Sequence, residues 1–328
     1  MPGMRPPIRF LVVVACAPVL ALGDDAPLDA FPLRNHNPFL QVYGLPPFAT
    51  HELVAPGGID FNVSFDIAND MDEADRGGEV LTIDGELRTL NLSVRHRLGE
   101  RLEIGFDVPY LSYSGGFLDR VIYDFHDLVG LSNSSRDGPN DQFRLYMEKN
   151  GETLFELVEP SSGIGDLQVS AALRFGKATL RASIKAPTGD PDKLTGSGAA
   201  DLAVGLYGGG ATTVLGQPLS YAGFVGVLAL GDGDILPTLQ RDAVAYGGVA
   251  LRWQATERLA LATQVYGQGP YFDAELKELG GDTLQLAFGC DYRFPEQRLL
   301  LRFAIAEDMR GAAAPDFAAH VSIRRYIP

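Results

Sequence analysis

Apolar and polar residues alternate along most of this chain, and the alternation defines about twelve segments. In each segment every second side chain falls on one face, which is the pattern of a β-strand with an apolar face and a polar face. The segments are 58–69, 80–97, 100–114, 164–175, 178–187, 200–211, 219–230, 244–254, 258–268, 282–294, 298–307 and 316–326. Segment 219–230 is apolar on both faces, so its register is the least well defined.

Short polar turns and longer loops separate these segments in turn. The turns lie near 98–101, 176–177, 216–218, 254–257 and 295–297, and the loops lie near 70–79, 115–163, 188–199, 231–243, 269–281 and 308–315. An even number of long strands, with short turns at one end and long loops at the other, is typical of bacterial outer-membrane barrels. We therefore predict an all-β fold: an antiparallel transmembrane β-barrel of about 12 strands over residues 58–328.

The two faces of each segment predict which side chains meet lipid. In segment 58–69, Phe61 and Val63 would point outward, and Asp60 and Asp66 would point into the lumen. A soluble β-sandwich has the same alternation with its apolar face turned inward. Strands of about ten residues or more favour the barrel, because strands of soluble sheets usually have about five or six residues.

The start of the chain has the features of a secretory signal. Arg5 and Arg9 precede an apolar run at residues 10–22, and Ala21 and Gly23 supply the small residues at the third and first positions before the cleavage site. We predict a signal peptide over residues 1–23, removed by cleavage after Gly23. The alternative is a lipoprotein signal, in which Cys16 would be the acylated residue.

Residues 24–57 do not alternate and are rich in proline, which predicts an irregular segment at the periplasmic side. It is either a linker or a plug of the barrel. As a plug it would fold into the lumen and place its carboxylates, among them Asp29 and Glu52, against luminal arginines.

The long loop 115–163 is predicted to be extracellular and to have structure of its own. Apolar residues recur at helical spacing between Phe117 and Val129, and Gly130 is suited to end the helix. After this short extracellular helix, Asn150-Gly151 predicts a two-residue hairpin between residues 142–147 and 153–158. We expect this hairpin to stand above the membrane rather than to span it.

Arginine recurs on the polar face of the segments. The candidate luminal or selectivity residues are Arg95, Arg101, Arg174, Arg252, Arg258, Arg293, Arg298, Arg302 and Arg324. They could form ion pairs with luminal carboxylates such as Glu103 and Asp107, which would only stabilise the wall. They could instead form an anion-attracting constriction, because rings of Arg and Lys select anions in pores.

The formal net charge is −15 and the isoelectric point is about 4.7. The acidic residues concentrate in Gly/Pro/Asp-rich stretches such as 69–79 and 189–193, which suits exposed loops. A nucleic-acid partner is not expected, because binding nucleic acid requires a basic face.

Several motifs resemble an uncharacterised family of proteobacterial outer-membrane β-barrel proteins, a domain of unknown function. They are Arg34-Asn35-His36-Asn37-Pro38, Gly44-Leu45-Pro46, Asp124-Phe125-His126-Asp127 with Gly130-Leu131, and Gly163-Ile164-Gly165-Asp166-Leu167. A weaker similarity, to outer-membrane barrels of a phenol-degradation meta pathway, rests on Lys185-Ala186-Pro187-Thr188-Gly189-Asp190, Gly196-Ser197-Gly198 and Asp201. The second resemblance implies, by analogy, uptake of small hydrophobic compounds.

Candidate chemical sites are few. His320-Val321-Ser322 has the His-x-Ser spacing of outer-membrane lipid hydrolases, but its pair would face the lumen, and the sequence identifies no acidic or amide partner for the histidine. Asp190, Asp192 and Asp201 could bind calcium, but their spacing matches no EF-hand loop. We therefore predict no catalytic residues, no metal and no cofactor, and expect that the protein is not an enzyme.

The sequence predicts a Gram-negative outer-membrane channel or binding protein for a small, hydrophobic or anionic solute. Its expected partners are outer-membrane lipid, the barrel-assembly machinery and the solute. One alternative is a sealed structural or surface-interaction barrel without transport. The other is an outer-membrane lipid hydrolase that uses Ser322.

Overall fold

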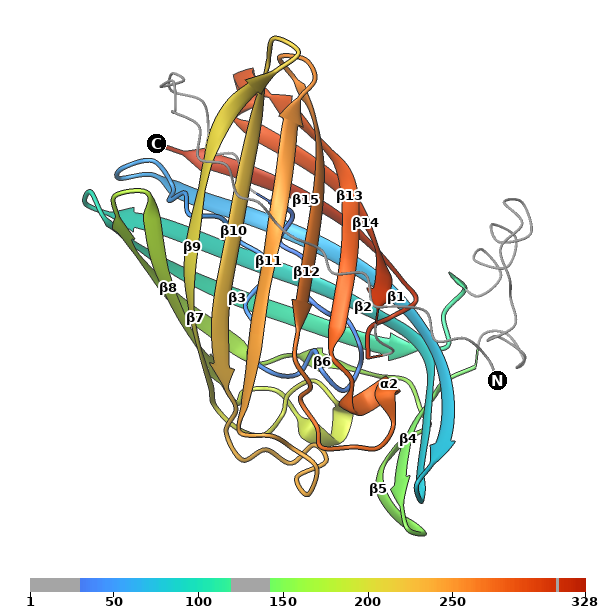
Figure 1. The fold of residues 1–328 in the computed structure, drawn as a ribbon. Coiled ribbons are helices and arrows are strands. Elements are labelled where there is room, and N and C mark those ends of the chain that lie inside the picture. Colours follow the sequence, from blue (N-terminus) through green and yellow to red (C-terminus); the bar gives the residue numbers. More distant parts are fainter. Residues whose placement is uncertain (1–29, 119–141, 311–312) are drawn as a thin grey trace, which may run out of the picture.

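A computed structural model describes residues 30–118, 142–310 and 313–328 (Figure 1). Twelve long strands form an antiparallel ring: β1 (Ile59–Arg76), β2 (Glu79–Leu98), β3 (Leu102–Ser114), β7 (Leu167–Phe175), β8 (Ala178–Ala186), β9 (Asp201–Val214), β10 (Gln217–Ala229), β11 (Ala243–Gln254), β12 (Leu259–Gln268), β13 (Thr283–Phe294), β14 (Leu299–Arg310) and β15 (Phe317–Ile327). The first and last strands pair from Ile59 opposite Ile327 to Asn69 opposite Phe317, which closes the ring. The predicted all-β barrel of twelve strands is confirmed.

Three shorter strands lie outside the ring. They are β4 (Arg144–Lys149), β5 (Glu152–Leu157) and β6 (Ser161–Ile164). The predicted hairpin around Asn150-Gly151 is therefore present as β4–β5, and β4 continues the sheet on the projecting end of β2. The helical turns in the described part of the chain are short: η1 (Pro191–Lys193), α2 (Lys277–Gly280) and η2 (Pro295–Gln297).

The prediction of a loop near residues 70–79 is wrong. Strand β1 continues to Arg76, and a tight turn at Gly77-Gly78, with φ of 63° and 82°, leads directly into β2. This part of the hairpin projects beyond the ring (Figure 1). Its two-sided polarity resembles a loop because neither face of an extension beyond the barrel has to meet lipid.

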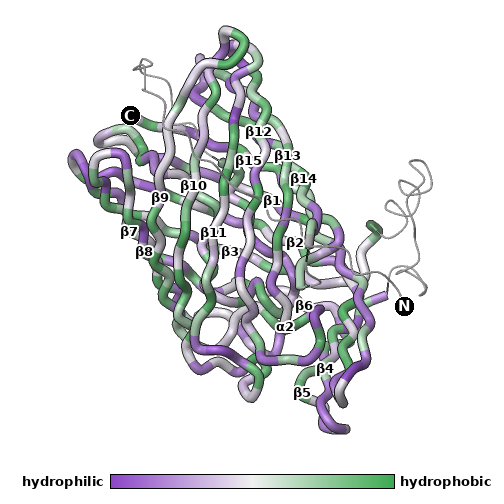
Figure 2. The backbone as a smooth tube through the Cα atoms, in the orientation of Figure 1, coloured by the Kyte–Doolittle hydropathy of each residue, from purple (hydrophilic) through white to green (hydrophobic). Residues whose placement is uncertain are grey.

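The two faces of the strands are as predicted in β1. Phe61 and Val63 are exposed on the outside of the ring, whereas Asp60 and Asp66 are buried within it. Figure 2 shows the corresponding alternation of hydrophobic and hydrophilic positions along the strands. In the described ranges, helices long and apolar enough to cross a membrane are absent.

The inner face of strand β10 is apolar because it packs against apolar groups. Val225 and Val227 are exposed on the outer face, while Leu228 is buried on the inner face. Phe224 lies edge-on to Phe48 of the N-terminal segment, with 4.7 Å between ring centroids. The inner face thus packs against another part of the chain instead of water.

The largest group of buried apolar residues lies at the loop end of the barrel. It joins residues 39–45 to the projecting end of β2, to β4 and to the loops before β11 and β13, and includes Phe39, Tyr43, Leu81, Ile83, Met147, Leu236, Tyr271, Phe272 and Leu279. This core places the N-terminal residues between barrel wall and loops. The predicted signal peptide (1–23) and most of the predicted helix (117–129) lie outside the described residues.

Candidate functional site

The described part of the predicted irregular segment 24–57 lies inside the ring, where residues 30–54 form what we call the luminal segment (Figure 1). Near its start, the Phe31 backbone N–H donates to Gln264 Oε1 of β12 at 3.1 Å. Near its end, Thr179 Oγ of β8 donates to the His51 carbonyl oxygen at 2.5 Å. Between these points the chain runs to the loop end of the barrel and returns.

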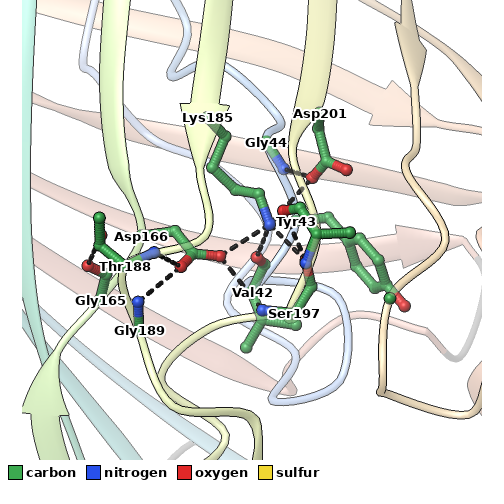
Figure 3. A network of polar contacts seen from close by, with 12 residues as sticks. Val42, Tyr43, Gly44, Gly165, Asp166, Lys185, Thr188, Gly189, Ser197 and Asp201 are labelled. Carbon is green, nitrogen blue, oxygen red and sulfur yellow. Dashed lines mark hydrogen bonds and ion pairs between the residues drawn. The ribbon is translucent and has the colours of Figure 1, made fainter.

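At the loop end, a buried lysine binds the middle of the luminal segment (Figure 3). Lys185 of β8 is 2% exposed, and its Nζ lies 2.7 Å from Asp166 Oδ2 and 3.2 Å from Asp201 Oδ2. The same ammonium donates to Ser197 Oγ and, at 3.2 Å, to the carbonyl oxygen of Val42. We call Lys185, Asp166, Asp201 and Ser197 the lysine cluster.

The two carboxylates of the lysine cluster also accept backbone N–H groups. Asp166 Oδ1 accepts from Thr188 and Gly189 at 2.9 and 2.8 Å. Asp201 Oδ2 accepts from Gly44 of the luminal segment at 2.8 Å. A buried charge is tolerated when it is paired and its hydrogen-bonding atoms have partners, and these contacts supply both conditions.

Close packing around the lysine cluster explains two glycines of the loop between β8 and β9. A Cβ at Gly189 would lie 2.4 Å from the Thr195 carbonyl oxygen, and one at Gly196 would lie 2.5 Å from Asp166 Oδ1. A Cβ atom is essentially never found so close to a non-bonded atom, so a side chain at Gly189 would displace the loop and one at Gly196 would displace Asp166 or the loop. The motifs at 44–46, 163–167, 185–190 and 196–198, which are far apart in sequence, thus meet at one place.

Tyr43 adds a second contact at the loop end. Its hydroxyl group donates to the Ile235 carbonyl oxygen at 3.1 Å, and its ring lies 5.4 Å from that of Tyr271. Burial raises the pKa of the Tyr43 phenol, so the hydroxyl group stays protonated and keeps this donor.

Toward the turn end, Arg181 of β8 holds the returning part of the luminal segment. Its Nη2 and Nε donate to the carbonyl oxygens of Glu52 and Thr50 at 2.7 and 3.0 Å. Its Nη1 donates to Glu103 Oε1 at 2.9 Å, and Glu103 Oε2 accepts the Val54 N–H at 2.7 Å. One ion pair of the wall therefore binds three backbone groups of the segment.

At least four of the nine predicted arginines form ion pairs with carboxylates of the barrel wall. Arg95 lies 2.8 Å from Asp107, and Arg252 lies 2.7 Å from Asp291. Arg324 pairs with Asp60, and Arg302 Nε lies 3.5 Å from Asp291 Oδ1. Arg302 also donates from Nη1 to the carbonyl oxygen of Ala30, at 3.0 Å, so it contacts the luminal segment.

The other five predicted arginines also lie toward the turn end. Arg174 is 3.4 Å from Glu52 of the luminal segment, and Arg293 is half-buried on β13. Arg101, Arg258 and Arg298 are exposed and belong to the turns between strands. These three are therefore rim residues rather than residues of the inner wall, because period-two parity continues only while the chain stays extended.

The sequence reasoning missed the lysine cluster as a site. Asp201 is considered only for a calcium loop and within the motifs of a resemblance, and Lys185 appears only within such a motif. One signal was present: Lys185 continues the inward face of β8, which also carries Thr179, Arg181 and Ser183. Its partners could not be identified, because they come from three separate segments.

The spaces between the luminal segment and the wall are small. Three cavities, lined in part by His36, Lys185, Arg181 and Arg302, have volumes of about 30, 90 and 50 Å³. A water molecule takes about 30 Å³ of liquid volume, so each cavity has room for one to a few waters. At these three places the described residues leave only small spaces between the luminal segment and the wall.

Solved structures with a similar fold are outer-membrane barrels. The COG4313 outer membrane channel from Pseudomonas putida F1 has a TM-score of 0.56 and 15% identity, covering 84% of this chain and 98% of that chain. The Ralstonia pickettii toluene transporter TbuX has a TM-score of 0.40 and 9% identity, covering 84% and 90%. The NanC porin has a TM-score of 0.41 and 9% identity, covering 81% and 97%.

A comparison with curated proteins found no match. A family model described as "Protein of unknown function (DUF3187)" matches residues 9–327. This match spans the ring, the luminal segment and the lysine cluster. This chain folds as a closed twelve-stranded barrel similar to the solved outer-membrane channel. It belongs to the DUF3187 family.

Proposed function

We propose that this protein is an outer-membrane channel for a small solute and that the luminal segment is its plug. The observation that carries the proposal is the position of residues 30–54 inside a ring that closes without them. Every wall strand pairs with two other strands, so the plug supplies no bond to the ladder. Its departure would leave the barrel's main-chain hydrogen bonds intact.

The contacts of the plug favour release as a unit. Its polar contacts include hydrogen bonds from wall side chains to its backbone, as at Val42, Thr50 and Glu52. Water can replace such bonds, whereas a strand built into the sheet would be lost only with the fold. The fold similarity to a Pseudomonas putida channel supports passage by analogy.

The charge of the opened lumen favours an anionic solute. Arg174, Arg181 and Arg302 each contact the plug in the closed arrangement, and its departure would free donors on all three. Arginines that line a pore attract anions. We therefore propose a small, anionic solute and place the protein in the outer membrane after signal cleavage.

The first test compares single-channel conductance in planar bilayers. Lys185→Met removes the cation that holds Val42, and it should raise the open probability at least tenfold over the wild type, which should be mostly silent. Lys177→Met is the matched control, because Lys177 is an exposed lysine in the turn before the same strand. It should behave as the wild type does.

A different result would favour the sealed barrel that is the alternative. If Lys185→Met and a variant lacking residues 30–54 both insert but pass no current, the lumen does not conduct. Heat-modifiable migration on a denaturing gel would establish that each variant forms the barrel. Bilayers with equal current from the wild type and Lys185→Met would show that the lysine cluster does not hold the channel closed.

A further inference from the structure

Two successive hydrogen bonds connect a serine, a histidine and an aspartate on the inner wall. On β15, Ser322 Oγ lies 3.0 Å from His320 Nε2. On β1, Asp66 Oδ1 lies 2.7 Å from His320 Nδ1. The three residues are buried, with exposed fractions of 1%, 1% and 6% for Ser322, His320 and Asp66. We call them the luminal triad.

The atoms of the luminal triad are paired in the order that activates a serine. A carboxylate on Nδ1 favours the tautomer with hydrogen on that nitrogen, which leaves Nε2 free to accept the Ser322 hydroxyl hydrogen. This arrangement of nucleophile, base and orienting acid is recognised by its geometry on unrelated folds. The acid that the sequence did not identify is Asp66, which lies directly opposite His320 in the β1–β15 register.

The geometry points to a serine esterase site inside the barrel, in which Ser322 is the nucleophile, His320 is the general base and Asp66 is the positioning residue. The substrate class is a small carboxylic ester that enters the lumen. Membrane lipid is not the substrate, because Val321 and Ile323 face outward, 40% and 53% exposed, while the triad faces inward. This activity goes beyond the expectation of a barrel without catalysis.

The reaction would proceed in two balanced steps. Ser322 Oγ attacks the ester carbonyl carbon while its proton passes to His320 Nε2, and the leaving alcohol takes that proton as the C–O bond breaks. Water then attacks the carbonyl carbon of the acyl-serine and gives its proton to His320. The bond between this carbon and Ser322 Oγ breaks, and His320 returns the proton to Ser322 Oγ. The products are one carboxylic acid and one alcohol from one ester and one water.

Arg302 supplies a cation beside the nucleophile. It is opposite Ser322 in the β14–β15 register, on the same inner face. Its Nη1 already binds a carbonyl oxygen, that of Ala30 at 3.0 Å. A substrate carbonyl that replaced Ala30 would place its developing oxyanion on the same guanidinium, which is the role of an oxyanion donor.

The plug covers the luminal triad. His36 Nε2 of the plug lies 3.6 Å from Asp66 Oδ1, and the nearby cavity lined by His36, Ser64 and Asp66 has a volume of about 30 Å³. That volume fits about one water and no ester. Access thus needs the displacement of the plug on which the proposed channel also depends, but hydrolysis does not require conductance.

The test uses the full chain, folded in detergent micelles, and a fluorophosphonate probe that bonds only to activated serines. The wild type should be labelled slowly at Ser322, as located by mass spectrometry, and Lys185→Met should be labelled at least tenfold faster. Ser322→Ala should abolish labelling. His320→Gln and Asp66→Asn should slow it by about 100-fold or more, the usual contribution of a general base.

Ser220→Ala is the matched control, because Ser220 is a buried inward serine of β10 with no histidine bonded to it. It should be labelled as the wild type is. The inference is overturned if neither the wild type nor Lys185→Met is labelled, or if Ser322→Ala keeps the label. Conductance without labelling would refute the esterase alone, and labelling without conductance would refute the channel alone.

Discussion

Lys185 can release the plug and still keep both of its carboxylate partners. In the closed barrel its ammonium contacts Asp166, Asp201, Ser197 and the Val42 carbonyl oxygen. When the plug leaves, only the last contact is lost, so both carboxylates still compensate the buried cation. A residue that bound the plug alone would be left uncompensated, which costs several kcal/mol. The lysine cluster is therefore suited to reversible binding.

Replacing Lys185 should destabilise the closed barrel. Lys185→Met leaves Asp166 and Asp201 buried together without a cation, a loss of about 3–5 kcal/mol of unfolding free energy. The temperature at which heat-modifiable migration is lost should fall, and Lys185→Met with Asp201→Asn should recover part of it. An unchanged transition in Lys185→Met, equal to that of Lys177→Met, would contradict this role.

The plug binds the wall through aromatic packing as well as through hydrogen bonds. The ring centroid of Phe48 lies 4.7 Å from that of Phe224 and 6.3 Å from that of Tyr266, and both of these residues belong to wall strands. The inner side of β10 is apolar where this packing occurs, which accounts for a strand without a polar face. The plug and β10 thus form one packed unit, although neither shows this in its own residues.

Phe48→Ala should loosen the plug while leaving the ring intact. Removing a buried phenylalanine costs about 3–5 kcal/mol, and here the cost falls on the docking of residues 30–54. Limited proteolysis of the folded protein should cut within this range at least tenfold faster than in the wild type. Phe175→Ala, at a 53% exposed position, is the control. Equal cutting in all three proteins would show that the segment is not held by this packing.

Closure of the ring decides which distant residues share the lumen. It pairs β1 with β15, and so brings Asp66 to His320 across 254 positions of sequence. It also surrounds the plug with arginines from several strands, of which some bind acidic side chains and others bind the plug. The charge of the lumen is therefore different in the closed and the open barrel.

The open channel should prefer anions. In the Lys185→Met background, a salt gradient across the bilayer should give a reversal potential of the sign for anion flow. Arg302→Ala should move this potential toward zero. Arg258→Ala should move it less, because Arg258 is an exposed residue of a turn at the rim. Cation preference in the open channel would contradict the proposed solute class.

The sequence by itself determined the fold class, the number of barrel strands and the face on which most of their residues lie. These follow from period-two alternation and turn residues, which are local and need no knowledge of neighbours. The prediction from the sequence failed at residues 70–79. There the hairpin extends beyond the barrel, so its side chains no longer need to alternate between lipid and lumen. The signal peptide and the extracellular helix stay predictions.

The tertiary structure alone decided what fills the lumen. The plug has no periodicity, so its path depends on contacts with β8, β12 and the loops rather than on its own pattern. The lysine cluster and the luminal triad each combine residues from separate strands or loops. The residues of the luminal triad become neighbours only when the sheet closes on itself, because closure joins its first and last strands. Lys185 and Asp201 already lie opposite each other on the consecutive strands β8 and β9, but the contact of Lys185 with Val42 depends on the path of the plug.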